Sequence, residues 1–110
     1  MAILNTSVTS GNTTIFTSTG NNAITTMIFC NTSAYNPASP TSISSLLFVY
    51  AVPSGGSAGD GTLIVNGLPV PAGETVSFDQ EKIVLANGDF IVAKTNSLSN
   101  ITATVSTLAV

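Results

Sequence analysis

Residues 43–52, Ile-Ser-Ser-Leu-Leu-Phe-Val-Tyr-Ala-Val, form the most strand-like stretch of this chain. β-Branched and aromatic side chains are enriched in strands, and Pro53 closes the run. Because residues 46–50 are all apolar, with no polar alternation, we expect this strand to be buried on both faces.

Outward from this run, apolar and polar residues alternate with a period of two in many short segments. Sustained three-and-four spacing, as in an amphipathic helix, is absent. Towards the C-terminus, residues 101, 103 and 105 are predicted to face inward, opposite Thr102, Thr104 and Ser106, and Val76 and Phe78 are also predicted to face inward. The other predicted strands are residues 3–9, 13–18, 23–30, 62–65, 75–79, 82–86, 90–95 and 101–108.

Glycine, asparagine and proline divide the strands. Asn66-Gly67 and Asn87-Gly88 are strong signals for tight turns. Residues 68–71 contain two prolines and belong on a sheet edge or in a loop. We expect residues 31–42 to form an exposed loop and residues 53–61, rich in glycine, to form a mobile loop or a docking arm.

Eight or nine short strands in 110 residues predict a single all-β domain over residues 1–110. An antiparallel two-sheet β-sandwich is the simplest way to bury one face of each strand. Both a jelly-roll and an immunoglobulin-like order fit the pattern, and the sequence does not fix the strand order.

Charge is scarce: 6% of the residues are charged and the net charge is −3, while 44% are hydrophobic. Ordinary domains carry about 25% charged residues. Because Lys82 and Lys94 are the only basic residues, we expect neither nucleic-acid binding nor attraction to anionic membranes. The polar surface must come from Ser, Thr and Asn, with few charges to keep neighbouring molecules apart, which favours lasting contact with a partner.

The sequence offers little for catalysis or a cofactor. It has no histidine and a single cysteine, Cys30, in an apolar strand, so a buried structural thiol is the simpler interpretation. Without histidine, a Ser-His-Asp triad or a zinc site is excluded. We therefore expect no enzyme activity and no cofactor. The N-terminal residues show neither a basic region nor a long apolar core, so we expect synthesis in a cytoplasm without secretion.

Several polar groups have both a functional and an ordinary interpretation. The five carboxylates could hold calcium only if the fold gathered them, and otherwise are solvated turn residues; they are Asp60, Glu74, Asp79, Glu81 and Asp89.

Glycosylation triplets begin at Asn5, Asn12, Asn31 and Asn100, a number that this composition gives by chance. Residues 69–71 suit an edge segment better than a Pro-rich ligand. Tyr35 is the better exposed ring for a sugar, but one ring is a poor platform.

Several segments, taken in order, resemble small structural proteins of tailed-bacteriophage virions. The segments are residues 27–33 (Met-Ile-Phe-Cys-Asn-Thr-Ser), 47–53 with the following glycine loop, 70–75 (Val-Pro-Ala-Gly-Glu-Thr), 81–89 (Glu-Lys-Ile-Val-Leu-Ala-Asn-Gly-Asp) and 101–105. The likeness covers residues 23 to 108.

The resemblance implies a virion β-sandwich without catalytic residues. Its implied role is capsid decoration, in which the protein binds and stabilises the head lattice through the major capsid protein or other virion proteins. It also implies a homo-oligomer, with a trimer as one form. The alternatives are a neck, tail or fibre accessory protein, or a receptor- or carbohydrate-binding module. The residues that would bind a partner are not assigned by the sequence.

Overall fold

The computed structural model describes residues 2–33, 45–78, 82–96 and 100–110. Its secondary structure is nearly all β, which confirms the predicted class, and no helix in this part of the chain is long and apolar enough to cross a membrane. The nine strands of the described residues are β1 (Ala2–Val8), β2 (Thr13–Thr17), β3 (Asn22–Asn31), β4 (Ser45–Val52), β5 (Leu63–Val70), β6 (Thr75–Phe78), β7 (Ile83–Leu85), β8 (Phe90–Thr95) and β9 (Ile101–Ala109), and a short 3-10 helix, η1 (Asp60–Thr62), precedes β5.

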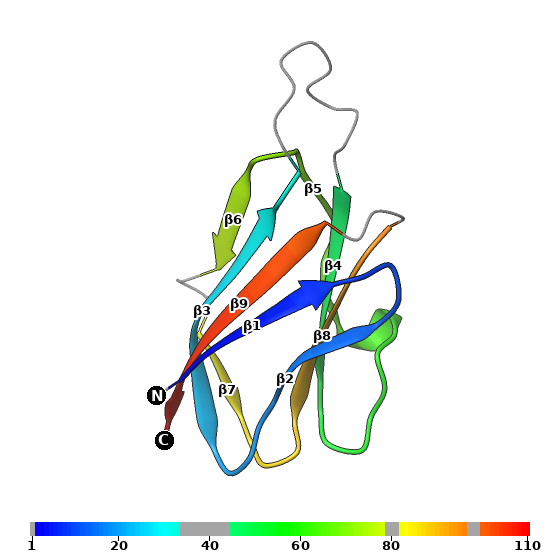
Figure 1. Cartoon of the computed structure of the whole chain (residues 1–110). Helices are drawn as coiled ribbons and strands as arrows, with labels where there is room; N and C mark the ends of the chain where they lie inside the picture. Colours follow the sequence, from blue (N-terminus) through cyan, green and yellow to red (C-terminus); the bar gives the residue numbers. More distant parts are fainter. Residues whose placement is uncertain (1, 34–44, 79–81, 97–99) are drawn as a thin grey trace.

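Two antiparallel sheets pack face to face, as predicted. The five-stranded sheet has the order β1-β9-β3-β6, and β7 also pairs with β3; the four-stranded sheet has the order β2-β8-β4-β5. Figure 1 shows the two sheets as layers, with the N- and C-termini close together beside the five-stranded sheet. The termini are close because β1 and β9 pair over their whole shared length, from Ala2 with Thr107 to Val8 with Ile101.

The strand order resolves the alternative between jelly roll and immunoglobulin. Strands β6 and β7 pair with successive parts of β3, so they act as one interrupted strand. The chain then pairs as a single rolled-up hairpin: β1 with β9, β2 with β8, β3 with β6 and β7, and β4 with β5. This is the jelly-roll order, in which the successive pairs of the rolled-up hairpin lie in alternate sheets.

The main core lies between the sheets and draws on the inner face of both. In β9, the inward residues Ile101, Ala103 and Val105 are buried and alternate with half-buried Thr102 and Thr104, as the sequence predicted. The large buried side chains include Phe29 of β3, Leu47 and Val49 of β4, and Ile91 of β8. Burying these side chains removes apolar surface from water, which stabilises the fold by about 25 cal/mol per Å². This is the main force holding the two sheets together.

The tight turn predicted at Asn66-Gly67 is wrong. Strand β5 runs through both residues, and Gly67 is the extra residue of a bulge, because Leu68 pairs with Leu47 while Asn66 pairs with Phe48. Gly67 has a φ of 72°, in the left-handed region. Glycine adopts this conformation both in bulges and in tight turns. The predicted edge position of Pro69 is confirmed, since β5 ends the four-stranded sheet.

The turn predicted at Asn87-Gly88 is present, and it carries the chain from one sheet to the other. The Asp89 amide donates to the Ala86 carbonyl across the turn, at 3.1 Å, and Gly88 has a φ of 89°. Strand β7 before the turn belongs to the five-stranded sheet, and β8 after it belongs to the four-stranded sheet. The turn is therefore one of the covalent links between the two layers.

The outward face of β4 is partly covered, so the prediction of burial on both faces holds for most of this strand. Tyr50 and Val52 form a second apolar cluster with Val92 of β8, against which Ala58 of the glycine-rich segment packs. Leu46, nearer the start of the strand, is 36% exposed, and there the prediction is wrong. Residues 53–61, predicted to form a mobile loop or a docking arm, have no strand; they are exposed except for half-buried Ala58, and they lead into η1.

Candidate functional site

Cys30 does not lie in the core, contrary to the prediction of a buried thiol. It is half-buried on the outer face of β3, between Thr75 of β6 and Thr102 of β9, because the inward positions of this strand belong to Phe29 and Asn31. Among the described residues, no three His, Cys, Asp or Glu side chains come together as metal ligands.

The described carboxylates do not form a calcium site. Asp89 has a structural role, because its Oδ1 accepts from the Ser54 amide at 2.8 Å and its Oδ2 accepts from the Ala86 amide at 2.9 Å. Asp60 begins η1 and Glu74 lies in the turn before β6, and neither belongs to a group of three possible metal ligands among the described residues. Asp79 and Glu81, like Tyr35, lie outside the described residues.

Two of the four candidate glycosylation asparagines are engaged inside the protein. Asn31, which was predicted to start an exposed loop, is instead the last residue of β3 and is 1% exposed. Asn100 donates from Nδ2 to the Ser33 hydroxyl at 2.8 Å and accepts from the Ser45 hydroxyl. These bonds hold the ends of β3, β4 and β9 together. Asn5 accepts from Thr104 Oγ1 at 2.8 Å, and Asn12 is exposed.

The strands of the five-stranded sheet present an outer face without charged residues of their own; the ammonium group of Lys82, just before β7, donates to the main-chain oxygen of Thr25 in β3 at 2.9 Å. Not one residue in the five strands of this sheet is charged, and among all nine described strands only Lys94 of β8 is. The outward positions of β9 carry Thr102, Thr104 and Ser106, and the facing positions of β3 carry Cys30, Ile28 and Thr26. Small hydroxyl and apolar side chains on a pleated surface can be desolvated at lower cost than charges.

One end of this outer face is apolar. Val84 of β7 and Leu108 of β9 both lie opposite Ala23 of β3, so the three form a row across three strands. Ile3 of β1 pairs with Ser106 and so lies diagonally from Leu108. Val84, Leu108 and Ile3 are 68%, 45% and 70% exposed. We call this row, Val84, Ala23, Leu108 and Ile3, the apolar row.

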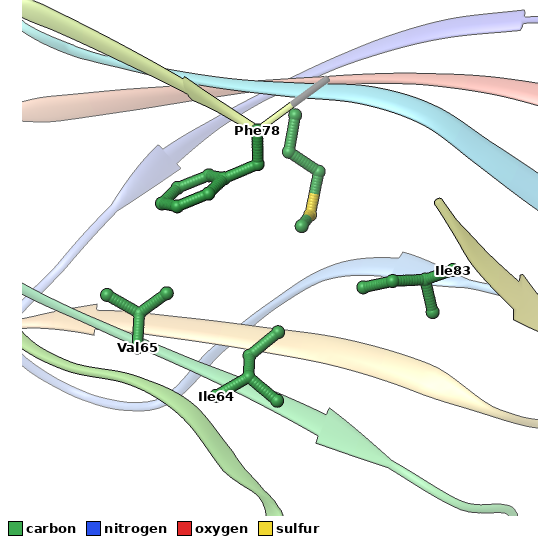
Figure 2. Close-up of a pocket in the computed structure, with 5 residues that line it drawn as sticks. Ile64, Val65, Phe78 and Ile83 are labelled. Atoms are coloured by element: carbon green, nitrogen blue, oxygen red, sulfur yellow. The ribbon is translucent and has the colours of Figure 1, made fainter. Parts of the chain in front are cut away.

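A cleft of about 450 Å³ opens between the edges of the two sheets, where β6 ends and β7 has not yet begun. Figure 2 shows Phe78 approaching from one layer and Ile64 and Val65 from the other, with Ile83 at the side; Met27 completes the lining. Phe78 is held edge-on to Phe29, with ring centroids 5.9 Å apart. The five lining residues that the structure describes are all apolar, so these side chains supply none of the polar groups that orient a specific small ligand.

The exposed aromatic platform that sugar binding needs is not formed by the described residues on the four-stranded sheet. Phe48, Tyr50 and Phe90 do lie on its outer face, but Tyr50 is buried. The Nζ of Lys94 lies 5.4 Å from the Phe48 ring centroid and 5.9 Å from that of Tyr50. Lys94 therefore makes a cation–π contact with these two rings within the protein itself.

Comparison with known proteins gave no match: no protein-family model, no curated protein and no solved structure corresponds to this chain. The resemblance to phage virion proteins therefore remains a prediction. Period-two alternation was the signal that located the outer-face residues of β9. The cleft and the apolar row gave no such signal, because each combines residues from strands that are distant in sequence.

Proposed function

We propose that this chain is a structural subunit of a tailed-phage virion and that its role is capsid decoration. It has no catalytic role in this proposal. It is made in the host cytoplasm and becomes part of the particle by binding the major capsid protein or another virion protein, thereby stabilising the head lattice.

The observation that carries the proposal is the outer face of the five-stranded sheet, whose strands contain no charged residue, with the apolar row at one end. Burying Ile3, Val84 and Leu108 against a partner would remove from water apolar side chains that the protein alone leaves exposed. Symmetry-related copies on a lattice would add avidity, so each single contact can be weak. The jelly roll is common among viral capsid domains, which supports the proposal by analogy of fold alone.

The decisive experiment is the composition of purified particles. We expect this polypeptide at a fixed copy ratio to the major capsid protein, measured by quantitative mass spectrometry of gradient-purified virions. A fixed ratio to neck, tail or fibre proteins would instead assign the protein to that part of the particle, and it would still be a virion structural protein. Absence from particles would overturn the proposal.

A pair of charge variants tests which face binds. Ser106→Lys places one positive charge on the outer face of the five-stranded sheet, and Thr14→Lys places the same charge on the outer face of the four-stranded sheet, where Thr14 pairs with Val92. We expect Ser106→Lys to weaken binding to particles that lack the protein and Thr14→Lys to bind as the unmodified chain does. Equal binding by both variants would exclude the outer face of the five-stranded sheet as the surface that binds the particle.

A further inference from the structure

The two sheets have four edges, and three of them carry features that oppose pairing with another strand. Strand β5 has Pro69 and two bulges, at Gly67 and at Ile64. Strand β2 has five residues and a bulge at Ile15. The fourth strand position of the five-stranded sheet is divided into β6 and β7, with four and three residues. Prolines, bulges and short strands are the usual means by which proteins block edge-to-edge association.

Strand β1 has none of these features. Its seven residues, Ala-Ile-Leu-Asn-Thr-Ser-Val, pair one for one with β9 without a bulge, and they include neither proline nor charge. Its other side presents unpaired main-chain N–H and C=O groups, as any edge strand does. Leu4 shows that this side is uncovered: it lies on the inner face, as buried Val8 does, and is still 39% exposed.

The charge distribution permits two copies to meet at this edge. Each copy carries a net charge of −3, yet no charged side chain occurs among the first 59 residues. The charged residues that the structure describes lie on η1, on β8 or near the turns before β6, β7 and β8, rather than on β1 or β9. Two copies that approach through β1 therefore keep their like charges apart.

We propose that β1 pairs in antiparallel fashion with β1 of a second copy, across a two-fold axis, so that two five-stranded sheets become one continuous sheet. A register centred on Asn5 pairs the whole strand, with Ile3 opposite Ser7 and Leu4 opposite Thr6 of the second copy. Residues of equal parity then oppose each other, so the inner and outer faces of both sheets stay aligned. A two-fold pair is closed, so it consumes both free edges and does not grow into a fibre.

This inference rests on the proposed function for its biological setting, and it specifies how two copies of the chain would associate. Its test uses the purified chain alone, by sedimentation velocity from about 1 µM to about 1 mM, the range in which small interfaces dissociate. We expect the mass to double reversibly with concentration. Because the experiment contains no particle, its failure would leave the particle-composition experiment unaffected, and absence from particles would leave a measured dimer unaffected.

Matched variants locate the contact. Leu4→Lys places an ammonium group on the inner side of the β1 edge, where pairing would bury it, and Leu46→Lys changes a side chain of similar exposure on β4 (39% against 36%). We expect Leu4→Lys to remain monomeric at every concentration and Leu46→Lys to dimerise as the unmodified chain does. Thermal unfolding of both variants checks that each is folded.

Hydrogen exchange of the unmodified chain gives a readout that needs no variant. Amides of β1 should gain protection between low and high concentration, whereas those of the edge strand β5 should not change. A monomer at the highest concentration, a trimer, or a dimer that Leu4→Lys leaves intact would each overturn the inference. A chain that is monomeric in solution and whose β1 is protected only on particles would assign the edge to a different protein, which also overturns it.

Discussion

Asn31 joins the two sheets, because its Nδ2 donates a hydrogen bond of 2.8 Å to the main-chain oxygen of Val70, 39 residues further along the chain. Asn31 ends β3 in the five-stranded sheet, and Val70 ends β5 in the four-stranded sheet. The bond is buried, and Asn31 Oδ1 also accepts from the Ser33 amide at 3.0 Å. Asn31 therefore links the two layers at this end of the sandwich, where the bonds of Asn100 also join β4 to the ends of β3 and β9.

We predict that Asn31→Ala lowers the free energy of unfolding by about 1–3 kcal/mol, because it removes buried hydrogen bonds whose remaining partners have been taken from water. Urea unfolding measures the change. Asn12→Ala, at an exposed turn, is the matched control and should stay within about 0.5 kcal/mol of the unmodified chain. Equal effects at both positions would contradict the role assigned to Asn31.

Gly88 should tolerate a methyl group less well than Gly20. Both glycines have positive φ, 89° and 74°, so alanine at either carries a backbone cost of about 1–2 kcal/mol. A Cβ at Gly88 would also lie 2.5 Å from Ser54 Oγ, whereas one at Gly20 would meet nothing within 4 Å. We expect Gly88→Ala to lose more stability than Gly20→Ala in the same urea experiment.

The double variant Ser54→Gly with Gly88→Ala separates the two causes. It removes the atoms that the new methyl group would meet and leaves the φ of residue 88 unchanged. Measured against Ser54→Gly alone, the added cost of Gly88→Ala should fall to that of Gly20→Ala. A cost that stays high would show that the close approach of Ser54 is not its source.

The contact between Lys94 and the rings of Phe48 and Tyr50 should be measurable as a coupling energy. We predict that a double-mutant cycle of Lys94→Met and Phe48→Leu gives about 0.5–1 kcal/mol, the range for cation–π contacts near the surface. Methionine keeps much of the apolar stem of lysine, so the cycle isolates the charge. A coupling indistinguishable from zero would indicate that the lysine only packs against the rings.

Local patterns in the sequence predicted the strands well and predicted the edges poorly. The alternation through residues 101–108 defines an inner and an outer face, and the structure confirms both. Asn66-Gly67 misled because a positive φ serves a bulge as well as a turn. The exposure of Leu4 and the half-burial of Cys30 depend on which strands lie beside β1 and β3. Both strands pair with β9, about 70 to 105 residues further along the chain, and periodicity contains no information about that pairing.

The single cysteine provides a direct test of the proposed binding face. Cys30 is half-buried on the outer face of the five-stranded sheet, beside Thr102, and Asn66 is exposed on the edge strand of the other sheet. We predict that a thiol reagent labels Cys30 in the free folded protein. Labelling should slow by at least about tenfold once the protein is bound to particles, because the partner would cover this face.

The control for this labelling experiment is a chain with Cys30→Ser and Asn66→Cys, whose only thiol lies on the opposite sheet. Its labelling rate should be the same free and bound. If the bound chain instead protects the thiol at residue 66 and leaves Cys30 reactive, the four-stranded sheet makes the contact. Protection of both would indicate burial of the whole domain, and protection of neither would contradict binding through either sheet. Since both chains carry one thiol each, the comparison depends on position and not on the number of reactive groups.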